Sequence, residues 1–295
     1  MKKTRVPIAS GRFYPEKKED LLTLIKQCFC DEKRGVGSLP DVGGLAHQYS
    51  GAVVPHAGIS ISGPIAAHSY AWLAKRGFAD VCVLIGPNHT GFGADVGVFS
   101  KGVWTTPLGE VVVDEPFAQA LLGQGLVDDE SAHLYEHSIE VQLPFLQYLS
   151  REKPFSIVPI SMLDQQMKTA KILGERIAEI AKKHPSKRIA VLASTDFSHV
   201  GPNYSLYPPE NMQSHEYGRM QDKKALDKIL DFDANGLIDV VSDEKISMCG
   251  SGPVAATLVA MKKLGAHSVE LLKYGDSYEV WPDSSVVGYG ALAIW

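Results

Sequence analysis

The stretch VCVLIGPNHTG, residues 81–91, decides the fold more than any other part of the sequence. It opens with apolar residues that do not alternate with polar ones, which is typical of a strand covered on both faces of a parallel or mixed α/β sheet. Gly86 and Pro87 then end the strand, and His89 follows at once. Glycine and proline set unusual backbone angles, so the stretch predicts a buried strand that presents a histidine at its carboxyl end.

The same pattern occurs twice more along the chain. VVPHAG, residues 53–58, brings His56 just past an apolar run, and STDFSHVG, residues 194–201, brings Asp196 and His199 past another. In open α/β sheets, ligands bind outside the carboxyl ends of the strands. A single histidine in such a place is more often a structural residue, whereas three at equivalent strand ends favour a shared site.

Apolar runs and helical patterns alternate along the whole chain, which predicts an α/β fold. We expect one domain, residues 1–295, with three layers around a mostly parallel or mixed sheet. The expected strands cover residues 51–55, 81–86, 96–100, 108–113, 155–160, 188–194, 269–274 and 286–294. The expected helices cover residues 18–29, 63–76, 115–122, 139–149, 164–183, 215–230, 234–241 and 252–264.

Composition restricts the class of protein. The chain has 295 residues, of which 45% are hydrophobic and 21% charged, with a formal net charge of −5. That charge argues against a nucleic-acid or anionic-membrane partner. No apolar run approaches the roughly 18 residues of a membrane span, and the basic start is not followed by the apolar region of a secretory signal. We therefore expect a cytoplasmic protein.

Cys249 is the cysteine with the strongest chemical context. It lies in CGSGPV, where Ser251 or Gly252 can cap a helix whose first turn contains Pro253. A thiol just before a helix N-terminus is expected to have a lowered pKa, which favours the thiolate. Cys249 is thus predicted to be reactive or metal-ligating, the alternative being a loop thiol without a role.

The segment HLYEHSIEVQLPF, residues 133–145, is the fourth candidate. Glu136 and His137 precede an amphipathic pattern and are candidates for lining the site or supporting its ligands. Glu140 can serve as the carboxylate of the capping turn. His133 and His137 are four residues apart and can bind a metal together if the segment is helical.

With these motifs in place, the chain resembles the Memo family, whose prokaryotic members are called AmmeMemoRadiSam system protein B. The resemblance runs through VVPHAG, GPNHTG, TPLGEVVVD, EHSIEVQLPFLQ, STDFSHVG, CGSGPV and WPDSSVVGYGALAI, in that order. The family is similar to the LigB-type class III extradiol dioxygenases. This implies a single α/β domain with a metal site at one edge of the sheet.

The resemblance also implies roles for individual residues. His56 and His89 match the two metal-binding histidines, and His199 matches the acid/base histidine, with Asp196 beside it. Cys249 stands where the dioxygenases supply a carboxylate. Fe(II) is the cofactor expected from the family, with copper or zinc as alternatives because a thiolate is a softer ligand. Phe13 or Tyr14 occupies the position of a cleft tryptophan.

Three functions follow from these observations. The first is a mononuclear metal redox enzyme, of dioxygenase-like chemistry, whose substrate can be a small molecule or a peptide. The second is a binding protein that recognises a phosphopeptide or another anionic ligand in the same cleft. The third is a metal-free hydrolase using Cys249, His199 and Asp196 as nucleophile, base and orienting group. The resemblance further implies association with AMMECR-type and radical SAM proteins.

Overall fold

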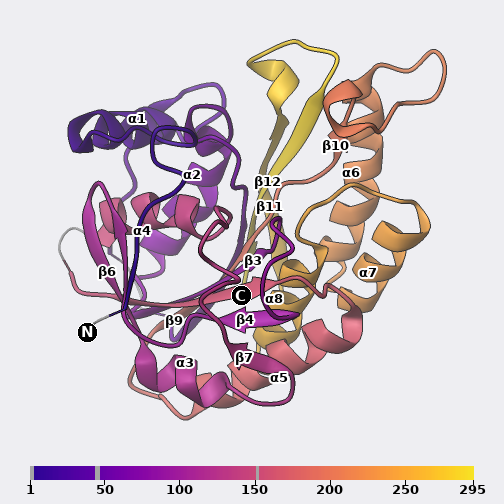
Figure 1. Cartoon of the computed structure of the whole chain (residues 1–295). Coiled ribbons are helices and arrows are strands. Elements are labelled where there is room, and N and C mark those ends of the chain that lie inside the picture. The colour runs from indigo at the N-terminus through magenta and orange to yellow at the C-terminus, as the bar shows by residue number, and fades with distance from the viewer. Residues whose placement is uncertain (1–2, 44–46, 151–152) are drawn as a thin grey trace.

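A computed structural model describes residues 3–43, 47–150 and 153–295 of the protein. A mixed sheet runs through the middle of the molecule, with helices on both faces (Figure 1). The predicted α/β class with three layers is confirmed. None of the helices within the described ranges is long and apolar enough to cross a membrane.

The strands of the sheet lie in the order β1-β5-β6-β8-β3-β9-β2-β12-β10, while β11 pairs with β12 and β4 pairs with β7 and β8. Their bounds are β1 Thr4–Arg5, β2 Tyr49–Val54, β3 Val81–Pro87, β4 Val96–Val98, β5 Val103–Thr106, β6 Gly109–Val113, β7 Leu126–Asp128, β8 Ser156–Met162, β9 Ile189–Ser194, β10 His199–Val200, β11 Val269–Asp276 and β12 Val286–Ile294.

The centre of the sheet is parallel, which positions the site. β9 pairs in parallel with β2 on one side and with β3 on the other. Every residue of β3 and β9 is buried, as their uninterrupted apolar sequences predict. The carboxyl ends of β2, β9 and β3 therefore meet at one edge, which brings His56, Asp196 and His89 to neighbouring strand ends.

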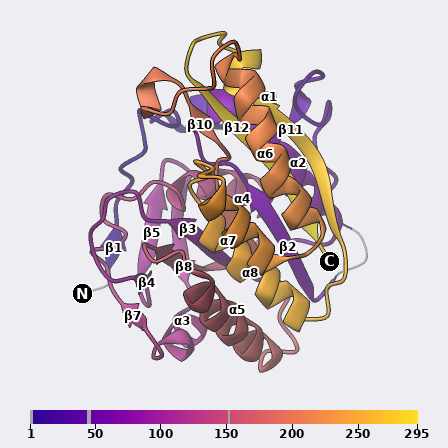
Figure 2. The same cartoon turned by 90° about the vertical axis from the view of Figure 1, so that its right-hand side faces the viewer.

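Two helix layers cover the sheet (Figure 2). One layer contains α1 and α2, with the shorter α4 packed against both. The other contains α3, α5, α6, α7 and α8, of which α5 and α8 pack most extensively together. The bounds are α1 Lys18–Cys30, α2 Ile59–Lys75, α3 Glu115–Leu121, α4 Leu143–Ser150, α5 Met167–Lys182, α6 Ser214–Leu230, α7 Ala234–Asp243 and α8 Ser251–Lys263, and short 3₁₀ turns cover Glu140–Gln142, Pro202–Tyr204 and Ser277–Glu279.

Helix α2 begins earlier than the sequence predicted, at Ile59 rather than at residue 63. Its first N–H, that of Ile59, donates to the carbonyl oxygen of Phe13 at 2.8 Å, so a distant segment satisfies the helix terminus. Gly63 lies inside the helix, at a position where a Cβ would be 2.6 Å from the sulfur of Cys28 on α1. The glycine thus serves close helix packing rather than a helix start.

Several short strands were not predicted. The expected strand over residues 108–113 is one arm of an antiparallel hairpin formed by β5 and β6. Its partner β5 was not expected from the sequence. The other strands that were not expected are β1, β7 and β10, each of two or three residues. Segments this short contain too few residues to display a period of two.

Gly86 allows a neighbouring segment to lie directly on the end of β3. A Cβ at this position would be 2.5 Å from Ser138 Oγ and 3.0 Å from Ile139 Cγ1. The Ser138 hydroxyl also donates to the carbonyl oxygen of Pro87 at 3.0 Å. This contact fixes the segment that contains Glu136 and His137 beside the strand that ends in His89.

We predict that Gly86→Ala lowers the free energy of unfolding by about 1–3 kcal/mol, because the added methyl group overpacks this contact. Urea denaturation measures the change. The matched control is Gly218→Ala in α6, where the nearest atom to a new Cβ is Val200 Cγ2 at 3.7 Å. That control should keep its stability or gain up to about 1 kcal/mol. Equal stabilities for the two variants would contradict the packing account.

Candidate functional site

His56, His89 and Cys249 converge at the carboxyl edge of the sheet. One ligand atom from each residue lies within 4.8 Å of the others. Cys249 Sγ lies 3.4 Å from His56 Nε2, within hydrogen-bonding distance for a sulfur atom. The rings of His56 and His89 meet edge to face with centroids 5.2 Å apart. The structure therefore brings together the imidazole pair and the thiol that the sequence singled out.

His56 is held rigidly and is only 2% exposed. Its backbone N–H donates to Asp196 Oδ1 at 2.8 Å, and its Nδ1 lies 2.8 Å from Ser194 Oγ. Burial lowers the pKa of His56 well below its usual value, and the neighbouring imidazoles of His137, His89 and His199 lower it further. The ring is consequently neutral at physiological pH, which is the form that binds a metal.

His89 is oriented by a buried carboxylate. Its Nδ1 lies 3.0 Å from Glu136 Oε1, and its backbone N–H donates to Glu136 Oε2 at 2.5 Å. A carboxylate accepts hydrogen bonds, so Nδ1 carries a hydrogen, and in the neutral ring the lone pair lies on Nε2. Burial would lower the pKa of His89, but the hydrogen bond and the charge of Glu136 outweigh it and raise the pKa. Glu136 also accepts the backbone N–H groups of His137 and Ser138. Such carboxylate–histidine pairs orient the histidines of metal sites.

Glu136 is charged in this setting. Burial would raise its pKa, but the hydrogen bond from His89 and the charges of His89 and His137 outweigh it and lower the pKa to about 2. The second group with metal-ligand spacing, His89, Glu136 and His137, therefore shares its carboxylate with four N–H donors. This arrangement suits the support of His89 better than direct ligation.

Cys249 differs in two respects from its prediction. Helix α8 begins at Ser251 with Gly250 as its N-cap, so neither Ser251 nor Gly252 is the cap, although the thiol still precedes the helix terminus. Burial of the sulfur raises its pKa far above the usual range, and the charge of Asp196 raises it further. The expected lowering of the pKa by the helix end is wrong, because desolvation dominates. The N–H of Asp196, 3.2 Å from the sulfur, is the backbone donor that faces it.

Asp196 and His199 lie near the site but are held separately. Asp196 Oδ1 accepts the N–H groups of His56 at 2.8 Å and Ala57 at 3.3 Å, and Oδ2 lies 4.0 Å from His56 Nε2. His199 Nδ1 donates to the carbonyl oxygen of Ser247 at 3.0 Å. Among the described contacts, no hydrogen bond joins Asp196 to His199. The carboxylate therefore positions the His56 loop, and His199 presents its Nε2.

The two aromatic candidates at the N-terminus, Phe13 and Tyr14, lie in different surroundings. The Phe13 ring lies on His137 with centroids 4.3 Å apart, and His137 in turn stacks on His89 at 4.9 Å. Tyr14 is buried and its hydroxyl donates to Glu140. Phe13 is thus the aromatic side chain beside the histidines, while Tyr14 belongs to the supporting core.

Glu140 holds an N-terminal strap, defined as residues 5–14, against the segment of residues 133–140 that contains Glu136 and His137. Its carboxylate forms a buried ion pair with Arg5 and accepts the N–H groups of Ile8 at 3.0 Å and Ala9 at 2.9 Å. The expectation that Glu140 caps the next helix is wrong, because its oxygens bind the strap instead. Arg5 could not be singled out from the sequence, where it is one basic residue of the N-terminal segment without a motif around it.

Arg5 ties the strap to the segment that holds His89. Its guanidinium donates to the carbonyl oxygens of His133 at 3.1 Å and Glu136 at 2.5 Å, and it lies over the Trp104 ring at 4.4 Å. The guanidinium of Arg5 therefore fixes the strap to the segment that contains His133 and Glu136.

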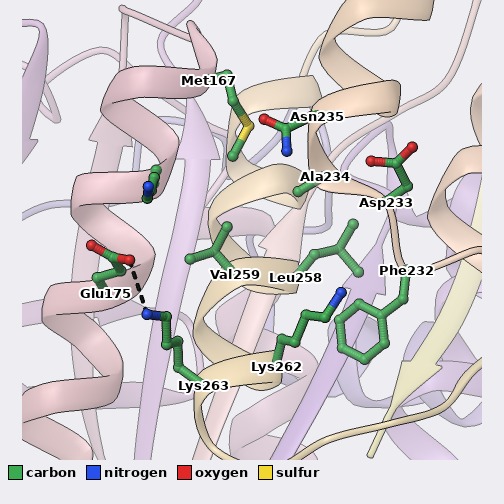
Figure 3. A pocket seen from close by; sticks show the side chains of 11 residues that line it. Met167, Glu175, Phe232, Asp233, Ala234, Asn235, Leu258, Val259, Lys262 and Lys263 are labelled. Atoms are coloured by element: carbon green, nitrogen blue, oxygen red, sulfur yellow. Dashed lines mark ion pairs between the residues drawn. The ribbon is translucent and has the colours of Figure 1, made fainter.

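A sizeable cavity lies elsewhere, among α5, α7 and α8, with a volume of about 420 Å³ (Figure 3). Leu258 and Val259 form apolar lining, and the Lys263–Glu175 ion pair spans one side at 3.1 Å. The described residues that line it include neither the site histidines nor Cys249. This cavity is not part of the site.

The fold and the cluster define an α/β protein with a histidine–cysteine site at the carboxyl edge of its sheet. Residues 5–293 match the model of the Memo-like protein family. A MEMO1 family protein of Methanopyrus kandleri is 43% identical over 291 residues, covering 98% of both chains. One of Methanocaldococcus jannaschii is 43% identical over 302 residues, covering 100% of both. The chain belongs to the Memo family.

A solved structure of an uncharacterized protein from Escherichia coli K12 is a more distant match. It is 13% identical with a TM-score of 0.48, and the alignment covers 83% of this chain and 99% of that one.

His133 lies away from the cluster and does not pair with His137 around a metal. It is fully buried, its Nε2 donates to the carbonyl oxygen of Gly97 at 3.1 Å, and its ring packs edge to face on Trp104. Burial lowers its pKa to about 4, although the bond to Gly97 opposes the shift. His133 and His137 do not lie in a regular helix, so their four-residue spacing does not bring the two rings together.

We predict that His133 makes the protein less stable as the pH falls from about 6.5 to about 4. In that range the unfolded chain takes up a proton at its usual pKa of about 6.5, while the native ring stays neutral. The loss between pH 7 and pH 5 should be about 2 kcal/mol. Urea denaturation of wild type and His133→Phe at both pH values isolates this contribution, and an identical pH dependence of the two would contradict it.

Proposed function

We propose that His56, His89 and Cys249 bind one redox-active metal ion, Fe(II) or copper, and that the protein acts in a redox reaction on a small molecule. The observation that carries the proposal is the convergence of two imidazole nitrogens and one sulfur within 4.8 Å of one another. Imidazole suits iron, copper and zinc alike, and a thiolate favours the softer of these ions.

The surroundings of the three donors support the proposal. His56 is neutral and offers a nitrogen lone pair. His89 has its Nδ1 hydrogen engaged by Glu136, so Nε2 is the atom it offers once a bound metal displaces any proton there. The N–H of Asp196 faces the sulfur and would donate to the thiolate that forms when a bound metal displaces the thiol proton. Part of the site is open to a reactant, since 33% of the His89 side chain is exposed. A bound metal would supply electron transfer and substrate activation here.

His199 is the group proposed to move a proton. Because its Nδ1–H is engaged by the Ser247 carbonyl oxygen, Nε2 is the atom that can take or release a proton. Tyr204 packs edge to face on its ring, with centroids 5.0 Å apart. His199 is thereby held in one orientation beside the cluster, as a general acid or base requires.

The other two functions have weaker support. For a hydrolase, the imidazole nearest to Cys249 is His56 rather than His199, and burial keeps the thiol protonated. A role in peptide binding stays a prediction. It is favoured by the exposed aromatic side chains of Phe92 and Tyr135, which lie next to the residues that hold His89.

Metal analysis after anaerobic purification tests the proposal. We expect about one iron or copper ion per wild-type chain. Cys249→Ser should lower the affinity for the metal by at least about 100-fold, since losing even a supporting residue of a metal site costs 10–100-fold. The matched control is Cys30→Ser, at an exposed thiol of α1, which should leave the metal content unchanged. Equal metal content in wild type and Cys249→Ser would refute the assignment.

A further inference from the structure

We propose that Ser194 is a positioning residue that fixes the tautomer of His56, with the hydrogen on Nδ1 and a free lone pair on Nε2. The relevance of this tautomer to metal binding rests on the proposed function, whereas the tautomer itself follows from the hydrogen bonds. Ser194 is the last residue of β9 and is 1% exposed. It therefore meets its protein neighbours and no bulk water.

The Ser194 hydroxyl has three polar neighbours at short distance. They are the carbonyl oxygen of Ser138 at 2.7 Å, Gln142 Nε2 at 2.8 Å and His56 Nδ1 at 2.8 Å. A carbonyl oxygen has no hydrogen to offer, so the single hydroxyl hydrogen of Ser194 points to Ser138. The serine oxygen must then act as an acceptor toward its other two neighbours.

The orientation of the Gln142 side chain is fixed independently of the serine. The Tyr70 hydroxyl donates to Gln142 Oε1 at 2.6 Å, and Gln142 Nε2 donates to the carbonyl oxygen of Pro55 at 3.1 Å. Burial raises the pKa of Tyr70 well above its usual value, so the phenol keeps its hydrogen and remains a donor. The amide nitrogen of Gln142 therefore faces Ser194 and donates one hydrogen bond to it.

One lone pair of the Ser194 oxygen remains, and it faces His56 Nδ1. A bare Nδ1 would set two lone pairs against each other at 2.8 Å in a buried place, which leaves both groups unsatisfied. An Nδ1–H instead completes the serine, which then donates one hydrogen bond and accepts two. The lone pair of His56 is thus placed on Nε2, 3.4 Å from Cys249 Sγ.

The two other strand-end histidines follow the same rule with different acceptors. His89 Nδ1 donates to Glu136 and His199 Nδ1 donates to the Ser247 carbonyl oxygen. All three rings therefore present Nε2. Only for His56 is the acceptor a hydroxyl that could itself donate, so the direction of its hydrogen bond depends on Ser138 and Gln142.

Nitrogen-15 NMR of the histidine rings in metal-free protein at neutral pH tests the proposal directly. Wild type should show His56 protonated at Nδ1. Ser194→Ala removes the acceptor and should move the hydrogen to Nε2, where Cys249 Sγ is the neighbouring acceptor. Ser194→Thr keeps the hydroxyl and should retain the wild-type tautomer. His89 and His199 should keep their hydrogens on Nδ1 in both variants.

Titration with Co(II) as the probe supplies the second readout. We expect Ser194→Ala to bind Co(II) about 10–100-fold more weakly than wild type, and Ser194→Thr to restore the affinity. A wild-type His56 protonated at Nε2, or a tautomer unmoved in Ser194→Ala, would overturn the role of Ser194. If wild type has the Nδ1–H tautomer but binds no metal, the metal assignment fails and the tautomer assignment stands.

Discussion

Parallel pairing on both edges of β9 is the constraint on which the site depends. Val54 at the end of β2 is in register with Ser194, and Ile85 near the end of β3 is in register with Ala193. The backbone hydrogen bonds of three buried strands thus fix where His56, His89 and Asp196 emerge. A shift of one residue in either pairing would turn the alternate side chains to the opposite face and disperse the cluster.

Polar groups then fix the orientation of the histidine side chains at these strand ends. Ser194, Glu136 and the Ser247 carbonyl oxygen each engage one histidine nitrogen. The Arg5–Glu140 ion pair then fixes the strap that places Phe13 beside His137. Removing one partner of such a buried pair costs about 3–5 kcal/mol, because the remaining charge is uncompensated. The site is therefore integrated with the core around it.

The sequence predicted what depends on local patterns. Apolar runs that end in glycine or proline located the central strands and the histidines that follow them. It could not predict the long-range partners, because the residues that hold Glu140 lie more than 120 positions away. The raised pKa of Cys249 has a related cause, since burial of the sulfur is set by tertiary packing that the local sequence does not display. The early start of α2 also depends on a remote acceptor, Phe13.

X-ray absorption at the metal edge of anaerobically isolated protein tests the central claim most directly, because it identifies the atoms bound to the ion. The account predicts one sulfur and two imidazole nitrogens in the first coordination shell, contributed by Cys249, His56 and His89. A shell made only of nitrogen and oxygen atoms, with the sulfur absent, would contradict it.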